Sequence, residues 1–236
     1  MKRLLQSIWR SSRSVANMCS IGLSGRKVAT VDQRRLWTRR ALTWKQEASA
    51  LADDTYYAGV DRRLVTALAQ LPNVERVLEV GCFSGYRLAK VQGALGSTPT
   101  IGLDVVFEGL QAAREAGIPS QQLVNGDARR LPFRSGSFDC VYTCVSLTHV
   151  SERHIGAVLG ELVRVTRRYV VLVEIYDRLM RLSRRLRVWA WTDGYCHAYP
   201  TLLAVQGLTQ LCLEGLEDGE GHPRCTLFVY ERRQAQ

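Results

Sequence analysis

Three acidic side chains lie where short apolar runs end, and these positions are suited to binding a polar ligand. Glu79 lies near the end of the run Val77–Val80, and Asp104 directly follows the run Ile101–Leu103. Asp127 follows the next apolar stretch. If the runs are neighbouring parallel strands, their carboxyl ends meet at one edge of a sheet, where ligands bind. Carboxylates there can accept hydrogen bonds from hydroxyl and amino groups, so we expect a nucleotide-type ligand.

A glycine-flanked turn joins the first of these runs to the next expected helix. Glycines at Gly81 and Gly85 permit close approach of a ligand to the backbone, and the following helix presents free N–H groups. An ordinary strand-to-helix turn is the alternative for this segment taken alone. Phe83 and Tyr86 occupy the second and third glycine positions of the dinucleotide fingerprint GxGxxG, which argues against a dehydrogenase.

Few side chains could act as a general base near this edge. His149 follows the fourth apolar run, and His197 and Tyr199 lie in a later segment expected on the same side. For each histidine, a structural hydrogen-bonded role is the alternative. Glu174 and Asp177, at the end of the fifth run, line an acceptor pocket or cap the next helix.

Short apolar runs alternate with amphipathic stretches from Arg76 onward, a pattern typical of a parallel sheet covered by helices. Upstream, 33–70 has the spacing of two helices joined near 53–57. The expected strands are 76–80, 100–103, 121–124, 138–143, 169–174, 213–217 and 225–231, and the expected helices between them are 86–95, 107–116 and 152–165. We therefore predict a doubly wound α/β sandwich whose sheet is mostly parallel, with one antiparallel strand.

From about Arg76 to Glu174 the chain resembles a class I S-adenosylmethionine-dependent methyltransferase of the small-molecule type, which includes the quinone-biosynthesis methyltransferases. The motifs are LEVGCFSG from Leu78, GLD ending at Asp104, NGDARRLPF from Asn125, SFDCVYTCVSLTHV from Ser137 and ELVRVTRRYVVLVE from Glu161. The resemblance implies S-adenosylmethionine as cofactor and no metal. It further implies that Glu79, Gly81 and Gly85 shape the methionine site, that Asp104 holds the ribose, that Asp127 and Ala128 hold the adenine, and that Cys144 and Val145 form the pocket floor. The other residues expected to bind the cofactor are Cys82, Phe83 and Val105.

Phe83 departs from this resemblance, because the family usually has glycine there. If the position requires a positive φ, phenylalanine costs about 1 kcal/mol or more.

The predicted organisation is a basic tail, 1–31, followed by one domain, 32–236. Within the domain we expect N-terminal helices at 33–70, a cofactor-binding core at 76–174, an acceptor-side insertion at 177–211 and C-terminal strands at 213–231. The insertion begins with an amphipathic basic pattern over 177–191. Its arginines and aromatic residues are expected to determine the acceptor, unless this helix is only a solvated charged face.

The formal charge of +10 suggests partners but identifies none. The tail lacks acidic residues, which is typical of a disordered tail, an organellar presequence or a membrane-surface helix. We expect a cytoplasmic protein, with a mitochondrial location as the alternative, and peripheral membrane contact through basic segments as a further option. No recognisable RNA-binding module accompanies the charge, so nucleic acid is not favoured.

The leading expectation is methyl transfer to the oxygen, nitrogen or carbon of a small molecule, which can be anionic or carrier-bound. An RNA or protein methyltransferase is the first alternative, supported by the charge. A catalytically silent, methyltransferase-like binding protein is the second, supported by Phe83 and by the lack of an unmistakable base. The sequence identifies neither the acceptor nor the oligomeric state.

Overall fold

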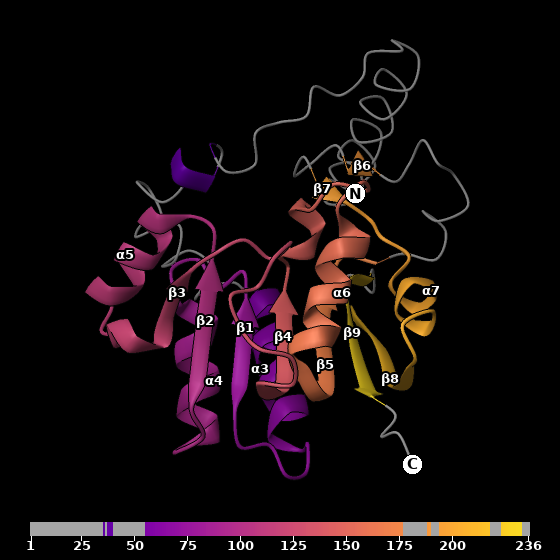
Figure 1. The fold of residues 1–236 in the computed structure, drawn as a ribbon, viewed down its shortest axis with the longest axis horizontal. Helices are drawn as coiled ribbons and strands as arrows, with labels where there is room; N and C mark the ends of the chain where they lie inside the picture. Colours follow the sequence, from indigo (N-terminus) through magenta and orange to yellow (C-terminus); the bar gives the residue numbers. More distant parts are fainter. Residues whose placement is uncertain are drawn as a thin grey trace, which may run out of the picture.

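A computed structural model describes residues 35, 37–39, 55–176, 188–189, 194–217 and 223–232 of the chain. In this part of the chain a seven-stranded sheet has the order β3-β2-β1-β4-β5-β9-β8 (Figure 1). The strands are β1 (Val77–Val80), β2 (Thr100–Asp104), β3 (Leu123–Asn125), β4 (Phe138–Cys144), β5 (Thr166–Glu174), β8 (Leu208–Glu217) and β9 (Pro223–Arg232). A separate two-stranded sheet pairs β6 (Val188–Trp189) with β7 (Gly194–Tyr195).

Strands β1 to β5 run parallel, whereas β9 lies antiparallel between β5 and β8. The register aligns Val80 with Leu103 and Asp104 with Asn125, so the carboxyl ends of β1, β2 and β3 lie at one edge. The predicted fold, a mostly parallel sheet with one antiparallel strand, is confirmed.

Helices cover both faces of the sheet, with α3 and α4 on one face, α6 and α7 on the other (Figure 1), and α5 packed with α4 beside β3. They are α3 (Thr55–Ala69), α4 (Tyr86–Leu95), α5 (Phe107–Glu115), α6 (Ile155–Val165) and α7 (Tyr199–Ala204), with short 3₁₀ turns η1 (Ser120–Gln122) and η2 (Leu147–His149). Because both faces are covered, the central strands read as continuous apolar runs. All seven residues of β4 are buried.

Alternation along each strand divides the core into two layers. Leu78 and Val80 pack with α6 residues on one face, while Val77 and Tyr142 pack with α3 residues on the other. The sheet thus holds strand ends rigidly at the edge where the acids lie.

Several predicted boundaries move for local reasons. The third strand begins at Leu123, two residues later than predicted, because the N–H of Gln122 bonds to the carbonyl of Pro119 in a tight turn. Helix α6 begins at Ile155 and not at 152, because the His154 N–H bonds to the Ser151 carbonyl in a preceding turn.

The C-terminal region differs more. Strand β8 begins at Leu208, so it takes residues from the predicted insertion 177–211. The expected basic helix over 177–191 is wrong at its end, where Val188–Trp189 is a strand. Its remaining residues, like the tail 1–31, lie outside the described residues. Among the described helices, none combines the length and the apolar character needed to cross a membrane.

Candidate functional site

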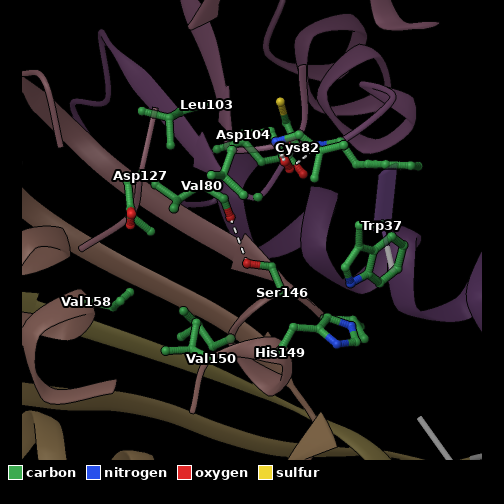
Figure 2. A pocket seen from close by; sticks show the side chains of 18 of the residues that line it. Trp37, Val80, Cys82, Leu103, Asp104, Asp127, Ser146, His149, Val150 and Val158 are labelled. Carbon is green, nitrogen blue, oxygen red and sulfur yellow. Dashed lines mark hydrogen bonds between the residues drawn. The ribbon is translucent and has the colours of Figure 1, made fainter. Parts of the chain in front are cut away.

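A cavity of about 940 Å³ opens at the carboxyl edge of the parallel strands. Ten of the eleven residues predicted for the cofactor line it, namely Glu79, Gly81, Cys82, Phe83, Asp104, Val105, Asp127, Ala128, Cys144 and Val145. Figure 2 shows Asp127 and Val158 at one side of this cavity and Trp37 with His149 at the other. The structure therefore brings the predicted strand ends together around one space.

Asp104 is the last residue of β2, and its carboxylate bonds to the turns that follow β1 and β2. Its Oδ2 accepts the backbone N–H of Phe83 at 2.8 Å, and its Oδ1 accepts that of Val106 at 2.8 Å. Burial raises the pKa of this carboxyl, while the two backbone donors favour its charged form. Each oxygen retains a second lone pair, so the carboxylate can still accept hydrogen bonds from a ligand at its 8% exposed surface.

The turn after β1 has an unusual backbone. Gly81 has φ 85° and Gly85 has φ 71°. A Cβ on Gly81 would lie 2.3 Å from the Ser146 Oγ, so only glycine fits beside the cavity at this point. A Cβ on Gly85 would lie 2.2 Å from Ile118 Cδ1, and Gly85 does not line the cavity. Gly85 therefore serves helix packing, unlike the ligand contact that the resemblance implies.

Phe83 has φ 46°, the left-handed conformation anticipated if this position requires a positive φ. Its ring packs against α5, where a Cβ on Gly109 would lie 2.6 Å from the ring. The Trp37 ring meets it edge-to-face at 5.2 Å. The absent side chain at Gly109 thus makes room for the aromatic ring.

Glu79 is a buried carboxyl in the cavity wall. Its Oε2 accepts the hydroxyl hydrogen of Tyr142 at 2.9 Å. Burial raises the pKa of Glu79 to about 7, against the opposing effects of the Tyr142 hydrogen bond and of the Arg87 charge. The cavity therefore contains a carboxyl that changes charge near neutral pH. Cys82 and Cys144 also line it, and burial raises the pKa of both thiols, so they remain uncharged.

Asp127 lies at the side of the cavity that Figure 2 shows beside Val158. Both of its oxygens accept hydrogen bonds from the Arg129 Nε, at 3.0 and 2.9 Å, and this contact lowers the pKa of Asp127. The carboxylate is fixed and charged, and its side chain remains 38% exposed. The neighbouring Ala128 completes this wall.

The loop after β4 is organised by Glu174, a fully buried residue at the end of β5. Its carboxylate accepts backbone N–H groups from Ser146, Leu147 and Thr148 and the hydroxyl of Thr143. Burial raises the pKa of Glu174 to about 7. Glu174 does not line the cavity, so its contacts hold the loop in place, and that loop carries His149.

His197 and Tyr199, predicted as candidate bases, lie outside the cavity lining. The Nε2 of His197 lies 2.8 Å from the Val150 carbonyl and 3.2 Å from that of Leu147. A carbonyl only accepts, so Nε2 carries the hydrogen and the ring clamps the η2 loop. Burial lowers the pKa of His197, which keeps it neutral. Tyr199 is fully buried in the core between the sheet and α6.

His149 lines the cavity, where its ring meets Trp37 edge-to-face at 4.8 Å (Figure 2). Tyr195, in β7, lines it as well. Sequence reasoning missed Trp37, which lies far from every motif and gives no local signal. Arg87 was not predicted either, although its position offers a signal. It is a cation in the first turn of a helix, where acidic residues are normally preferred.

Comparisons with known proteins agree with this geometry. Residues 77–168 match the family described as "Methyltransferase domain". A demethylmenaquinone methyltransferase of Beutenbergia cavernae is 35% identical over 125 residues, which cover 50% of this chain and 48% of that protein. The chain thus spans about half the length of this curated relative.

Two solved structures share the fold at low sequence identity. The magnesium protoporphyrin IX methyltransferase of Synechocystis, solved with bound S-adenosylmethionine, has a TM-score of 0.63 and is 14% identical, with 88% of this chain and all of that one covered. The N-methyltransferase NodS of Bradyrhizobium japonicum, solved with S-adenosylhomocysteine, also has a TM-score of 0.63 and is 15% identical, with 78% and 91% covered.

The matched segment contains β1 to β4 and the acids around the cavity. Residues 77–168 are thus similar to methyltransferase domains, and the sheet has the fold of these solved methyltransferases. The helix α3 and the strands β8 and β9 lie outside the matched residues but complete the sheet and its cover.

Proposed function

We propose that this chain transfers the methyl group of S-adenosylmethionine to a small-molecule acceptor. The observation that carries the proposal is the convergence of Glu79, Asp104 and Asp127 on one cavity within a methyltransferase domain. Carboxylates at these three strand ends match the ammonium, ribose hydroxyl and adenine amino groups of that cofactor.

The residues present fit the cofactor part by part. Asp104 would accept the ribose hydroxyls, Asp127 the adenine amino hydrogen, and the Ala128 N–H would face a ring nitrogen. Glu79 and Gly81, which both line the cavity, would receive the methionine end. Once bound, the cofactor supplies a methyl group on a positively charged sulfur, which needs neither a metal nor a covalent enzyme intermediate.

The chain's own residues would mainly position the acceptor and exclude water, which can lower the barrier by several kcal/mol. Among the candidate bases predicted from the sequence, His149 is the one that lines the cavity, where it could accept a proton from a hydroxyl or other protonated acceptor. We assign His197 a positioning role, because it holds the carbonyls on either side of His149.

The aromatic side chains that line part of the cavity favour an apolar or aromatic acceptor. Trp37, Phe83, His149 and Tyr195 supply rings there. The curated relative named for demethylmenaquinone supports a small molecule of this kind. The arginines 184, 185 and 187, predicted to hold an anionic group, lie outside the described residues, so the anionic or carrier-bound character of the acceptor stays a prediction.

The test is calorimetry with S-adenosylmethionine followed by a labelled methyl-transfer screen. The acceptors would be cell extract fractionated into small molecules, lipid, RNA and protein. We expect binding, and label in the small-molecule or lipid fraction. Label in RNA or protein would overturn the acceptor class, and absence of cofactor binding would favour a silent binding protein.

A further inference from the structure

Arg87 is a charged cavity residue whose partners are only partly supplied by the protein. It lies in the first turn of α4, and its side chain is 19% exposed where it lines the cavity. Burial and the positive end of the helix dipole both disfavour a cation there. Nearby negative groups, which include Asp61 and Glu79, nevertheless raise the pKa of Arg87, so it stays charged.

Asp61 of α3 fixes the position of this guanidinium. The Arg87 Nε donates to Asp61 Oδ1 at 2.9 Å, while Lys90 Nζ donates to Oδ2 at 2.6 Å. Asp61 is 3% exposed and shares one negative charge between two cations, so the cluster keeps a net positive charge. Within the described part of the chain, Nε is the guanidinium atom with a protein acceptor, which leaves both terminal nitrogens as donors for a ligand.

Glu79 places the opposite charge in the same wall. The charge of Arg87 lowers the pKa of Glu79, and Glu79 raises that of Arg87, so each group favours the charged form of the other. Both line the cavity beside Gly81. A free amino-acid group, with an ammonium and a carboxylate on one carbon, presents the complementary pair of charges.

We infer that Arg87 binds the α-carboxylate of the cofactor, that Glu79 faces its ammonium group, and that Asp61 positions Arg87. This inference rests on the proposed function and assigns to Arg87 and Asp61 roles that the motifs do not contain. It identifies α3, which precedes the matched family segment, as part of the cofactor site.

The test compares two probes by calorimetry on the full chain. S-adenosylhomocysteine carries the amino-acid end, whereas 5′-methylthioadenosine lacks it. We expect Arg87→Gln to weaken binding of the first about tenfold to a hundredfold, the usual loss for a charged hydrogen bond, and to leave the second within about twofold. Asp61→Asn should show the same selectivity, with a smaller loss.

Lys90→Gln is the matched control, because Lys90 shares Asp61 but does not line the cavity. It should leave both affinities nearly unchanged. Arg87→Lys keeps the charge but loses the paired donors, so it should retain part of the preference for S-adenosylhomocysteine. This variant also tests the inference if Arg87→Gln does not fold.

Equal losses for both probes, or no loss for either, would overturn the inference while the proposed function stands. A wild-type chain that binds neither probe would refute the proposed function, and the inference with it.

Discussion

The two ends of the cavity are built in different ways. At the proposed cofactor end, the acids and turns come from residues 79–128, and the Asp104 carboxylate accepts backbone N–H groups from two of these turns. At the other end, Trp37 precedes the core in sequence and meets the ring of His149, and Tyr195 follows the core in sequence and lines the same cavity.

This difference indicates a division of labour. Hydrogen bonds to a strand end fix direction as well as distance, as recognition of one cofactor requires. Ring contacts are less directional and are worth about 0.5 to 1.5 kcal/mol per pair. Changes at the cofactor end should therefore alter cofactor affinity, and changes at the aromatic end should alter turnover or acceptor binding.

The largest effect is expected at His149. If the acceptor must lose a proton, His149→Ala should lower turnover about a hundredfold to ten-thousandfold, since a positioned base contributes that much. Cofactor affinity should stay within about threefold of wild type. His154→Ala is the control, because His154 also lines the cavity. If turnover by His149→Ala is as fast as turnover by His154→Ala and by the wild type, His149 is not the base.

Asp104→Asn should weaken cofactor binding about tenfold to a hundredfold, because charged hydrogen bonds are worth about 1.5 to 3 kcal/mol. It should also lower the free energy of unfolding, since the amide NH₂ would face one of the two backbone N–H donors. Calorimetry and thermal unfolding measure both quantities, with Glu115→Gln, outside the cavity, as control. Unchanged affinity would contradict the ribose assignment.

Cofactor affinity should also depend on pH through Glu79. Its pKa is raised to about 7 by burial, so the carboxyl gains a proton as the pH falls through this value and loses its attraction for an ammonium group. The dissociation constant for S-adenosylhomocysteine should rise by up to about tenfold per pH unit below that point.

Measurements between about pH 5.5 and 7.5 keep the ligand's amino group protonated, because the pKa of an amino-acid ammonium group lies above this range. Glu79→Gln should flatten this profile. A profile that keeps its slope in the variant would assign the titration to another group.

Trp37→Ala should raise KM for an aromatic acceptor about twofold to tenfold. The variant lacks the indole ring that would contact the acceptor, and such a ring contact is worth about 0.5 to 1.5 kcal/mol. The affinity for S-adenosylhomocysteine should hardly change. Trp37→Phe keeps a ring and should recover most of the loss. If cofactor affinity falls as much as acceptor binding, the two ends of the cavity are not separate.

The smallest effect is expected at Phe83. Phe83→Ala removes the ring but keeps the Cβ at φ 46°, whereas Phe83→Gly removes both. Glycine should be more stable than alanine here by about 1 kcal/mol, since it tolerates a positive φ. Both should be less stable than wild type, because the ring fills the space beside Gly109. Equal stability of the two variants would show that the turn relaxes.

Much of the cofactor end could be predicted from the sequence. Apolar runs and turn glycines have fixed local meanings, and parallel strands bring their carboxyl ends to one edge, so the convergence of Glu79, Asp104 and Asp127 followed from pattern alone. The methyltransferase fold was predicted on the same motifs and is confirmed. The positive φ at Phe83 was anticipated from a missing glycine.

The sheet, its edge and the acids on that edge could thus be predicted from residue order alone, because each depends on local periodicity and on the ends of strands. Tertiary structure decided which further side chains face the cavity. Trp37 reaches His149, and Asp61 reaches Arg87, across long separations that no local pattern records. His197 was a candidate base, but in the structure its ring lies within hydrogen-bond distance of two backbone carbonyls and stabilises the loop that carries them. Only packing determines which groups lie next to a buried imidazole.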